Sequence, residues 1–460
     1  MNENHYEERL GTAKMLPLVF KMALPAVAAQ LVNLLYNIVD RVYIGHIPGI
    51  GTDALAGVGV TSSVIILIMA FSQIVSGGGA PLAAMALGRG DRERAEKILG
   101  NGVSLLLLFT LLNAIPVYVF MRPILLATGA SAATVGYAED YLSIYLIGTL
   151  SVQIATGLNT YINCQGRAGI AMLSVVIGAV LNIVLDPFFI FTCGMGVKGA
   201  AVATVLSQTV SGAWVLGFLL SRKATLRVRL SRMKPDKRIL GPVIALGIAP
   251  FIMASTESLV GFVLNGTLQH YGDIYVSALT VMQSAMQFVS VPLSGFAQGF
   301  VPIVSYNYGH RNPERVKQCF WLTLAVMFTF NLVAVLLLMV FPGPVARLFT
   351  DDAALVAKVA DIMPVFLAGM TIFGLQRECQ NMFVSLGQAK ISLFIALLRK
   401  VLLLVPLAIL LSKVWGVMGV YTAEAIADGT AAILCTGLFA VRFPRILRGI
   451  GGTTAEAAKE

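Results

Sequence analysis

Residues Gly178–Gln208 read GAVLNIVLDPFFIFTCGMGVKGAAVATVLSQ and decide how the rest of the chain is interpreted. The stretch predicts two apolar helices that are joined by a short turn at Cys193–Gly196. Asn182 and Asp186 lie four residues apart in the first helix, so both side chains project from one face. Pro187 follows directly, and we expect it to kink the helix and free a backbone carbonyl nearby.

A carboxylate at Asp186 in so apolar a run is costly unless a proton or a bound ion compensates its charge. Acidic residues inside membrane-spanning helices usually mark ion or proton pathways. The alternative is a structural carboxylate that accepts hydrogen bonds from a neighbouring helix. We favour the functional interpretation of Asp186.

Composition places the chain among polytopic membrane proteins. Of its 460 residues, 57% are hydrophobic and 12% are charged, whereas soluble domains carry about 25% charged residues. The net charge of +10 comes from basic residues in loops between apolar runs, which fits a membrane surface with anionic lipids better than nucleic acid. The five cysteines show no metal-binding or disulfide spacing. Residues 1–13 lack the pattern of a cleavable signal.

Twelve apolar segments are each long enough to cross a bilayer as a helix. The expected spans are 15–44, 54–87, 98–120, 137–159, 168–192, 198–221, 240–268, 276–308, 317–341, 358–385, 390–412 and 416–441. The predicted fold class is therefore an all-α membrane protein with twelve transmembrane helices.

The basic residues also orient the chain. On this assignment of spans, 24 Lys and Arg residues lie on the side of the N-terminus, 6 lie on the opposite side and 3 lie inside spans. Lys and Arg accumulate in cytoplasmic loops. We therefore expect a multi-pass membrane protein with both termini in the cytoplasm.

The two halves of the chain resemble each other. Gly88–Arg94 (GRGDRER) matches Gly309–Arg315 (GHRNPER) at an offset of 221 residues, and Pro81 matches Pro302 at the same offset. Six helices in each half give both halves the same orientation, which predicts a parallel repeat of two pseudo-symmetric lobes. The expected organisation is a tail at 1–14, a lobe at 15–221, a basic linker at 222–239, a lobe at 240–441 and a tail at 442–460.

Polar side chains of the first lobe gather at one depth. With a rise of about 1.5 Å per residue, Asp40, Asp186 and Thr204 lie roughly 8 to 9 Å from the outer ends of their helices. The side chains that share a helix face with Asp40 are Asn33, Tyr36 and Asn37. Two carboxylates with carboxamide and hydroxyl oxygens suit a hard monovalent cation or protons. The alternative is that Asp40 simply pairs with the adjacent Arg41.

The second lobe carries a different set of polar residues inside its spans. They are Glu257, Arg377, Glu378, Arg399, Lys400, Glu424 and Asp428. Pairing of the two basic residues of the eleventh span with Glu257 or Glu378 is as reasonable as a role in substrate binding. Gln283, Met286 and Gln287 can line a cavity for apolar cations, although methionines at helical spacing more often only pack.

Further motifs complete the pattern. They are Leu24-Pro25, Tyr36-Asn37-Ile38-Val39-Asp40, the two repeated loops, and Asn182-x-x-x-Asp186-Pro187 followed by Gly196-Val197-x-Gly199-Ala200-Ala201. Together with the twelve-helix repeat, they resemble the multidrug and toxic compound extrusion (MATE) family over about residues 15–445. The resemblance is to MepA-like and DinF-like bacterial members.

This resemblance implies an antiporter that expels lipophilic, often cationic drugs in exchange for protons or sodium ions. It implies a cation site formed by Asp40, Asn182, Asp186, Thr204 and the fourth-helix residue Tyr141. The residues assigned to substrate binding are Asn33, Tyr36, Asn37, Glu257, Gln283, Met286 and Gln287. Another branch of the family uses a glutamate on the seventh helix, which Glu257 matches, and an aspartate on the tenth, where this chain has Arg377-Glu378. The resemblance therefore leaves open whether the second lobe carries an ion site.

The alternative function is a flippase for lipid-linked precursors from the same broad superfamily. Such a flippase is expected to need a cationic cavity and often extra helices, whereas the first lobe here is acidic. We expect no enzymatic activity, because the sequence has no intramembrane His-Glu-x-x-His motif, no Ser-His pair and only four histidines, none of them in the middle of a span. The sequence also has no phosphate-binding loop, so energy for active transport has to come from an ion gradient. We also expect no cofactor besides H+ or Na+ as the coupling ion, and no nucleic-acid partner. Small lipophilic molecules and membrane lipids are the expected partners of a monomer.

Overall fold

The computed structural model describes residues 8–457, and every regular element in this range is a helix. The first half contains α1 (Glu8–Thr12), α2 (Met15–Gly45), α3 (Gly51–Gln73), η1 (Ile74–Gly79), α4 (Ala80–Gly88), α5 (Arg92–Val119), α6 (Met121–Ala127), α7 (Val135–Gly157), α8 (Asn159–Asn163), α9 (Ala168–Pro187), η2 (Phe188–Thr192) and α10 (Val197–Leu220). The linker contains η3 (Leu230–Arg232). The second half contains α11 (Lys237–Gln269), α12 (Asp273–Gly309), α13 (Pro313–Val340), α14 (Pro342–Arg347), α15 (Ala353–Leu367), η4 (Ala368–Ile372), α16 (Phe373–Ser385), α17 (Ala389–Leu397), η5 (Leu398–Leu404), α18 (Val405–Trp415) and α19 (Val417–Ala457).

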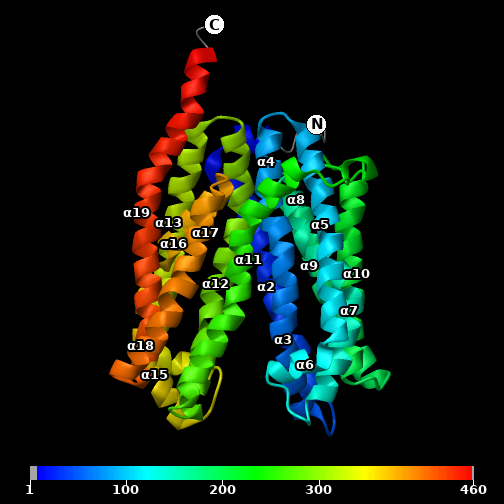
Figure 1. Cartoon of the computed structure of the whole chain (residues 1–460), viewed down its shortest axis with the longest axis vertical. Helices are drawn as coiled ribbons and strands as arrows, with labels where there is room; N and C mark the ends of the chain where they lie inside the picture. The colour runs from blue at the N-terminus through cyan, green and yellow to red at the C-terminus, as the bar shows by residue number, and fades with distance from the viewer. Residues whose placement is uncertain (1–7, 458–460) are drawn as a thin grey trace.

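The described residues form 12 helical segments that are long and apolar enough to span a membrane, so the predicted fold class is confirmed. Several spans consist of more than one element, such as α3, η1 and α4 in Gly51–Gly88. The last helix runs to Ala457, well beyond the predicted span end at 441. Its extension is amphipathic, with Phe443 and Ile450 buried and Arg445 exposed. Figure 1 shows this extension running on beyond the end of the bundle.

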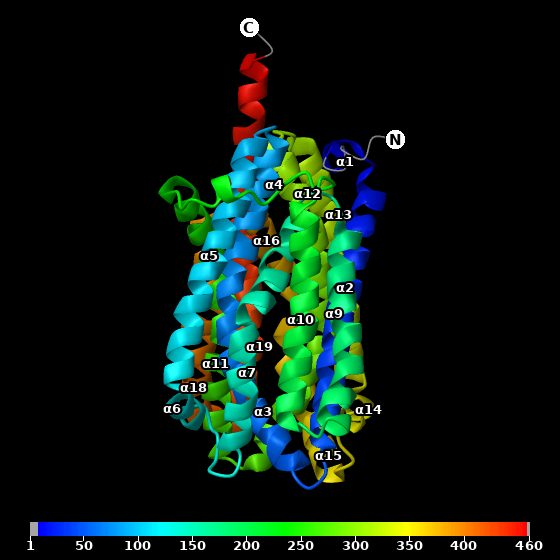
Figure 2. The ribbon, with the colours of Figure 1, turned by 90° about the vertical axis from the view of Figure 1, so that its right-hand side faces the viewer.

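The helices separate into two groups that follow the order of the chain. Figure 1 shows α2 to α10 on one side and α11 to α19 on the other, with the two termini at the same end of the bundle. We call this the terminal end; α6 and α15 lie at the opposite end. Viewed from the side in Figure 2, α5, α7, α9 and α10 run along the face of the first lobe. The lobe limits predicted above stay predictions, but α10 ends at Leu220 and α11 begins at Lys237.

The repeated loops fold in the same way in both lobes. The Asp91 carboxylate caps α5 by accepting a hydrogen bond of 2.9 Å from the backbone N–H of Arg94. Asn312 caps α13 by accepting one of 3.1 Å from the N–H of Arg315. Asp and Asn at this position satisfy an N–H group that a helix start leaves free. The 221-residue offset therefore reflects a repeated helix start.

Two glycines bring the lobes into backbone contact at the terminal end. A Cβ atom added to Gly88 would lie 2.0 Å from the carbonyl oxygen of Tyr306, and one added to Gly309 would lie 2.0 Å from that of Met85. Gly88 and Gly309 are 221 residues apart, and so are Met85 and Tyr306, so the repeat relates one contact to the other. Any other side chain would push the helices apart. These two contacts are therefore copies of each other within the repeat, and they add to the wider packing of α12 on α2 and α4 and of α11 on α3 and η1.

The predicted kink at Pro187 takes the form of a widened helix. α9 ends at Pro187, and the chain continues directly as the π-helical segment η2. Proline removes one backbone N–H donor, and π-turns of this kind occur frequently at functional sites. The turn at Cys193–Gly196 then leads into α10 as expected.

Candidate functional site

The proposed cation site lies inside the first lobe and is built from four helices. Asp40 comes from α2, Tyr141 from α7, Asn182 and Asp186 from α9, and Thr204 from α10. All five are buried, with Asp40 8% exposed and Asp186 fully buried. Because α9 and α10 pack on each other and on their neighbours α2 and α7, polar groups far apart in sequence meet here.

Three of the five side chains are joined by hydrogen bonds. The Asn182 amide donates to an oxygen of Asp186 at 3.1 Å and to the hydroxyl of Thr204 at 3.4 Å. Tyr141 lies close to Thr204 and Asp40. The carboxyl groups of Asp40 and Asp186 contact each other directly. Asp40 and Asp186, which the sequence analysis placed at the same depth, are therefore neighbours in the structure.

Three oxygen atoms of this set remain buried without a hydrogen-bond partner. They are Oδ1 of Asp40, Oδ1 of Asn182 and Oδ2 of Asp186. Oxygens of this kind are costly to bury unless a proton or a cation satisfies them. The alternative, an ion pair of Asp40 with Arg41, is absent from the ion pairs of residues 8–457, and the Arg41 side chain is exposed.

Two touching carboxylates inside a membrane protein cannot both keep an uncompensated negative charge. Two chemical solutions fit this donor set. A proton can be shared between Asp40 and Asp186, or a hard monovalent cation can bind to the carboxylate, carboxamide and hydroxyl oxygens. Both solutions allow the site to gain and lose one positive charge.

The polar residues of α2 that we assigned to substrate binding lie beside this site. The Tyr36 hydroxyl accepts a long hydrogen bond of 3.5 Å from the amide of Gln208 on α10. The Asn37 amide, which is exposed, donates to the backbone carbonyl of Asn33 at 2.7 Å. Gln208 was missed in the sequence, although it follows Thr204 by four residues and therefore lies on the same face of α10.

The candidates on α12 occupy a different surface. Gln283 and Met286 are half-buried and Gln287 is exposed. Glu257 on α11 lies instead beside Lys400, at 3.9 Å, with its side chain 62% exposed. The structure thus places Glu257 in the charged cluster of the second lobe, apart from the cation site.

This charged cluster surrounds the π-helical segment η5, which carries Arg399 and Lys400. Arg399 contacts Asp428 at 2.6 Å and lies 4.0 Å from Glu424, which Lys400 approaches to 3.6 Å. Basic and acidic charges therefore compensate each other inside the second lobe. A pocket of ≈ 290 Å³ adjoins the cluster and is lined by Met253, Glu257, Gln376, Gln380, Ile395, Ala396, Arg399 and Lys400.

Glu378 does not belong to these ion pairs. Its carboxylate is fully buried and accepts a hydrogen bond of 2.6 Å from the hydroxyl of Thr323 on α13. Of the two glutamates considered as partners of the basic pair, Glu257 contacts Lys400, whereas Glu378 is held by Thr323. Thr323 was missed because a threonine in an apolar helix gives no distinct sequence signal.

The family model MatE matches two stretches of the chain, residues 25–188 and 250–410, which together cover more than half of it. The chain belongs to the MatE family. One matched stretch falls in each lobe, so membership rests on both halves of the repeat. The resemblance to the MATE family stated above is confirmed.

Characterised relatives of this MatE-family chain are multidrug export proteins. It is 24% identical over 412 residues to the multidrug export protein MepA of Staphylococcus haemolyticus strain JCSC1435, covering 90% of each chain. It is also 24% identical over 418 residues to MepA of Staphylococcus aureus strain RF122, covering 89% of this chain and 90% of the relative. These matches extend over both lobes and are nearly full-length.

Solved structures show the same fold. A crystal structure of MATE in the bent conformation superimposes with a TM-score of 0.89, at 24% identity, over 98% of this chain and 99% of the other. An outward-facing conformation of a MATE family transporter of the MOP superfamily also gives 0.89, at 24% identity, over 97% and 99%. The MatE-family chain is thus a multi-pass membrane protein with the MATE architecture, while the roles of its site residues stay predictions.

Proposed function

We propose that this protein is a cation-coupled antiporter that exports lipophilic, often cationic compounds from the cytoplasm across the bacterial inner membrane. Its main support is the buried contact between Asp40 and Asp186, whose free oxygens require a proton or a monovalent cation. The export function of the MepA relatives supports the class of substrate. The acidic interior of the first lobe favours export over a flippase for lipid-linked precursors.

The position of α2 connects ion binding to movement of the lobes. α2 carries Asp40, packs on α9 inside the first lobe and packs on α12 of the second lobe. A change of charge at Asp40 therefore acts on a helix that both lobes share. If ion binding favours one arrangement of the lobes and thereby weakens drug binding, then drug binding must weaken ion binding by the same factor.

The orientation follows from the bias in basic residues, which places the terminal end in the cytoplasm. With this orientation, the glycine contacts at Gly88 and Gly309 hold the cytoplasmic end closed. In the proposed cycle, this state releases substrate outward and takes up the coupling ion at Asp40 and Asp186. Opening of the cytoplasmic end must break both contacts. One chain contains both lobes, so we propose a monomer as the working unit.

Transport in inside-out membrane vesicles tests this function. A fluorescent lipophilic cation is supplied outside, and a proton gradient or a sodium gradient is imposed separately. We expect one of the two gradients to drive uptake into vesicles that contain the protein, and an ionophore that dissipates this gradient should abolish it. The proposal would be contradicted if neither gradient changes the uptake, or if the uptake equals that into vesicles without the protein.

A further inference from the structure

A second pocket lies between the lobes at the terminal end, far from the cation site along the helices. It is a small open hollow between α4, α5 and the start of α11. Its lining residues are Leu82, Met85, Ala86, Arg89, Arg94, Ile98, Arg238, Ile239 and Pro242. Three of the nine are arginines and none is acidic, so the lining carries a formal charge of three positive units.

The arginines of this pocket have no acidic partner. Among the ion pairs of residues 8–457, none includes Arg89, Arg94 or Arg238. The nearest glutamates of α5 are occupied elsewhere. Glu93 contacts Lys97 at 3.0 Å and Arg232 at 2.8 Å, and Glu96 contacts Arg92 and Arg229 at 3.9 and 3.5 Å.

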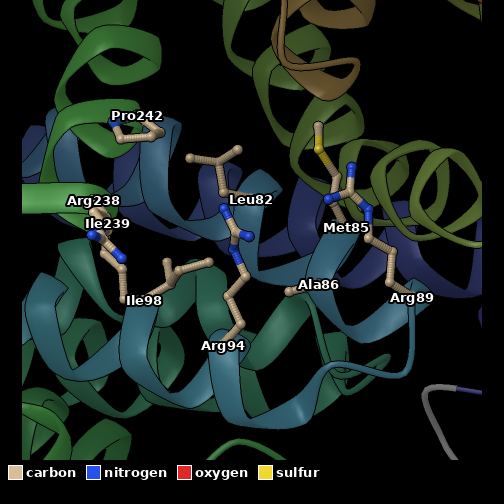
Figure 3. A pocket seen from close by; sticks show the side chains of 9 residues that line it. All are labelled: Leu82, Met85, Ala86, Arg89, Arg94, Ile98, Arg238, Ile239 and Pro242. Carbon is tan, nitrogen blue, oxygen red and sulfur yellow. The ribbon is translucent and has the colours of Figure 1, made fainter.

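The three side chains are spread across one opening. Figure 3 shows Arg94 between Arg238 and Arg89, with its guanidinium group directed toward Leu82 in the middle of the pocket. Arg94 lies in the first turn of α5 and Arg238 in that of α11. The carboxylates of Asp91 and Asp236 already cap these two helix starts. The preference of the pocket for an anion therefore rests on the three guanidinium groups.

The remaining walls are apolar. Ile98 and Ile239 are buried beneath the opening, whereas Leu82 is half-buried and Pro242 is exposed, so these two present the apolar surface. The pocket also lies at the ends of membrane-spanning helices, where lipid headgroups meet water. A free phosphate ion would use the arginines but not the apolar surface. A phospholipid uses both, because its phosphate binds guanidinium groups while its glycerol and upper acyl chain cover the apolar side chains.

We propose that this pocket binds the phosphate group of an anionic phospholipid. Arg89 and Arg94 belong to the first lobe and Arg238 to the second, so one headgroup contacts both lobes. Binding stabilises the state in which the terminal end is closed, since the pocket exists only while the lobes are together. This inference is independent of the coupling ion and of the transported compound.

Lipid retention by the purified full-length protein tests the site. Phosphatidylglycerol is added to delipidated protein in detergent, and bound lipid is counted by native mass spectrometry. The variant Arg89→Gln/Arg94→Gln/Arg238→Gln should bind phosphatidylglycerol at least about tenfold more weakly than the wild type, because three basic contacts to the headgroup are lost. Phosphatidylcholine, which has no net charge, should bind weakly to both proteins.

A matched control changes the same charge elsewhere at the same end. Arg442, Arg445 and Arg448 are exposed on α19 and lie outside this pocket. The variant Arg442→Gln/Arg445→Gln/Arg448→Gln should retain phosphatidylglycerol like the wild type. Equal loss in both triple variants would overturn the proposal in favour of diffuse surface attraction.

Two further arms complete the test. Inorganic phosphate and glycerophosphoglycerol carry the anion without acyl chains, and they should displace the lipid only weakly; displacement at concentrations similar to those of the lipid would show that the site takes a free anion.

If the triple variant is not stable, Arg94→Lys and Arg94→Gln replace it. The lysine variant should bind more tightly than the glutamine variant, and equal binding of both to the wild-type level would contradict the site.

Discussion

Asp186→Asn is expected to abolish gradient-driven efflux while the protein still reaches the membrane. The carboxamide of the new Asn cannot take up a proton or balance the charge of a bound cation. Only the Asp40 carboxyl group then remains to hold the coupling ion. Loss of one interaction between a buried ion and a charged oxygen costs about 1.5–3 kcal/mol, so ion affinity should fall by about tenfold to a hundredfold. Asp40→Asn should have the same effect. Efflux of a fluorescent dye from whole cells measures both variants.

The matched control is Asp53→Asn. Asp53 lies in the first turn of α3, in the same lobe, and its side chain is exposed. This variant should pump like the wild type. Wild-type efflux from Asp186→Asn at equal protein amounts in the membrane would exclude the pair as the coupling site.

The second large effect is expected at the glycines that join the lobes. In Gly88→Ala or Gly309→Ala, the new methyl group would lie 2.0 Å from a backbone carbonyl oxygen of the other lobe. The helices must separate to admit it, and such overpacking costs about 1–3 kcal/mol. The closed state at the terminal end should therefore lose about tenfold to a hundredfold in population. The two variants should behave alike, because the contacts are copies of each other.

Distances between spin labels at Arg92→Cys and Lys317→Cys report this separation, since both positions are exposed and belong to different lobes. The label distance should lengthen in each glycine variant, and dye efflux should fall. Gly217→Ala and Gly437→Ala serve as controls, because a Cβ atom at either position meets nothing within 4 Å. An unchanged label distance in Gly88→Ala would show that the contact does not close this end.

Much of the fold was predictable because each spanning helix needs a long apolar run, and such runs are visible in the sequence. The repeat was equally visible, since the loops around Asp91 and Asn312 start helices by the same capping chemistry. The end of α19 was not predicted, because Arg442, Arg445 and Arg448 interrupt the apolar run beyond residue 441.

The common depth of Asp40, Asp186 and Thr204 was predictable from the sequence, whereas their role as a cation site stays a prediction. A helix has a fixed rise per residue, so Asp40, Asp186 and Thr204 had to lie at one level in a bundle of spanning helices. Which helices are neighbours is not encoded in any single helix. For this reason the contact of Gln208 with Tyr36 was found only in the structure.

The partners of charged residues in the second lobe were harder to predict. Arg399 contacts Asp428 and lies near Glu424, while Glu378 is held by Thr323. Several acids of similar depth compete for one guanidinium group, and only the packing of α16, α19 and η5 decides between them. The arginine pocket between the lobes was equally hidden, because its members come from loops and helix starts on both sides of the linker.

The central claim is that the coupling ion and the exported compound compete through Asp40 and Asp186. The direct measurement is the affinity of the purified protein for a fluorescent drug in detergent, across pH at zero sodium and across sodium at constant pH. Protonation of the pair adds positive charge, so if protons are the coupling ion, drug affinity should fall as pH falls. If sodium is the coupling ion, affinity should instead fall as sodium rises.

A tenfold change in affinity needs only about 1.4 kcal/mol of coupling, which neutralisation of one buried carboxylate readily supplies. The account predicts that one of the two titrations weakens drug binding by about tenfold or more, and that Asp40→Asn and Asp186→Asn both make that titration flat. Wild-type affinity that stays constant across both pH and sodium would contradict the competition between ion and drug.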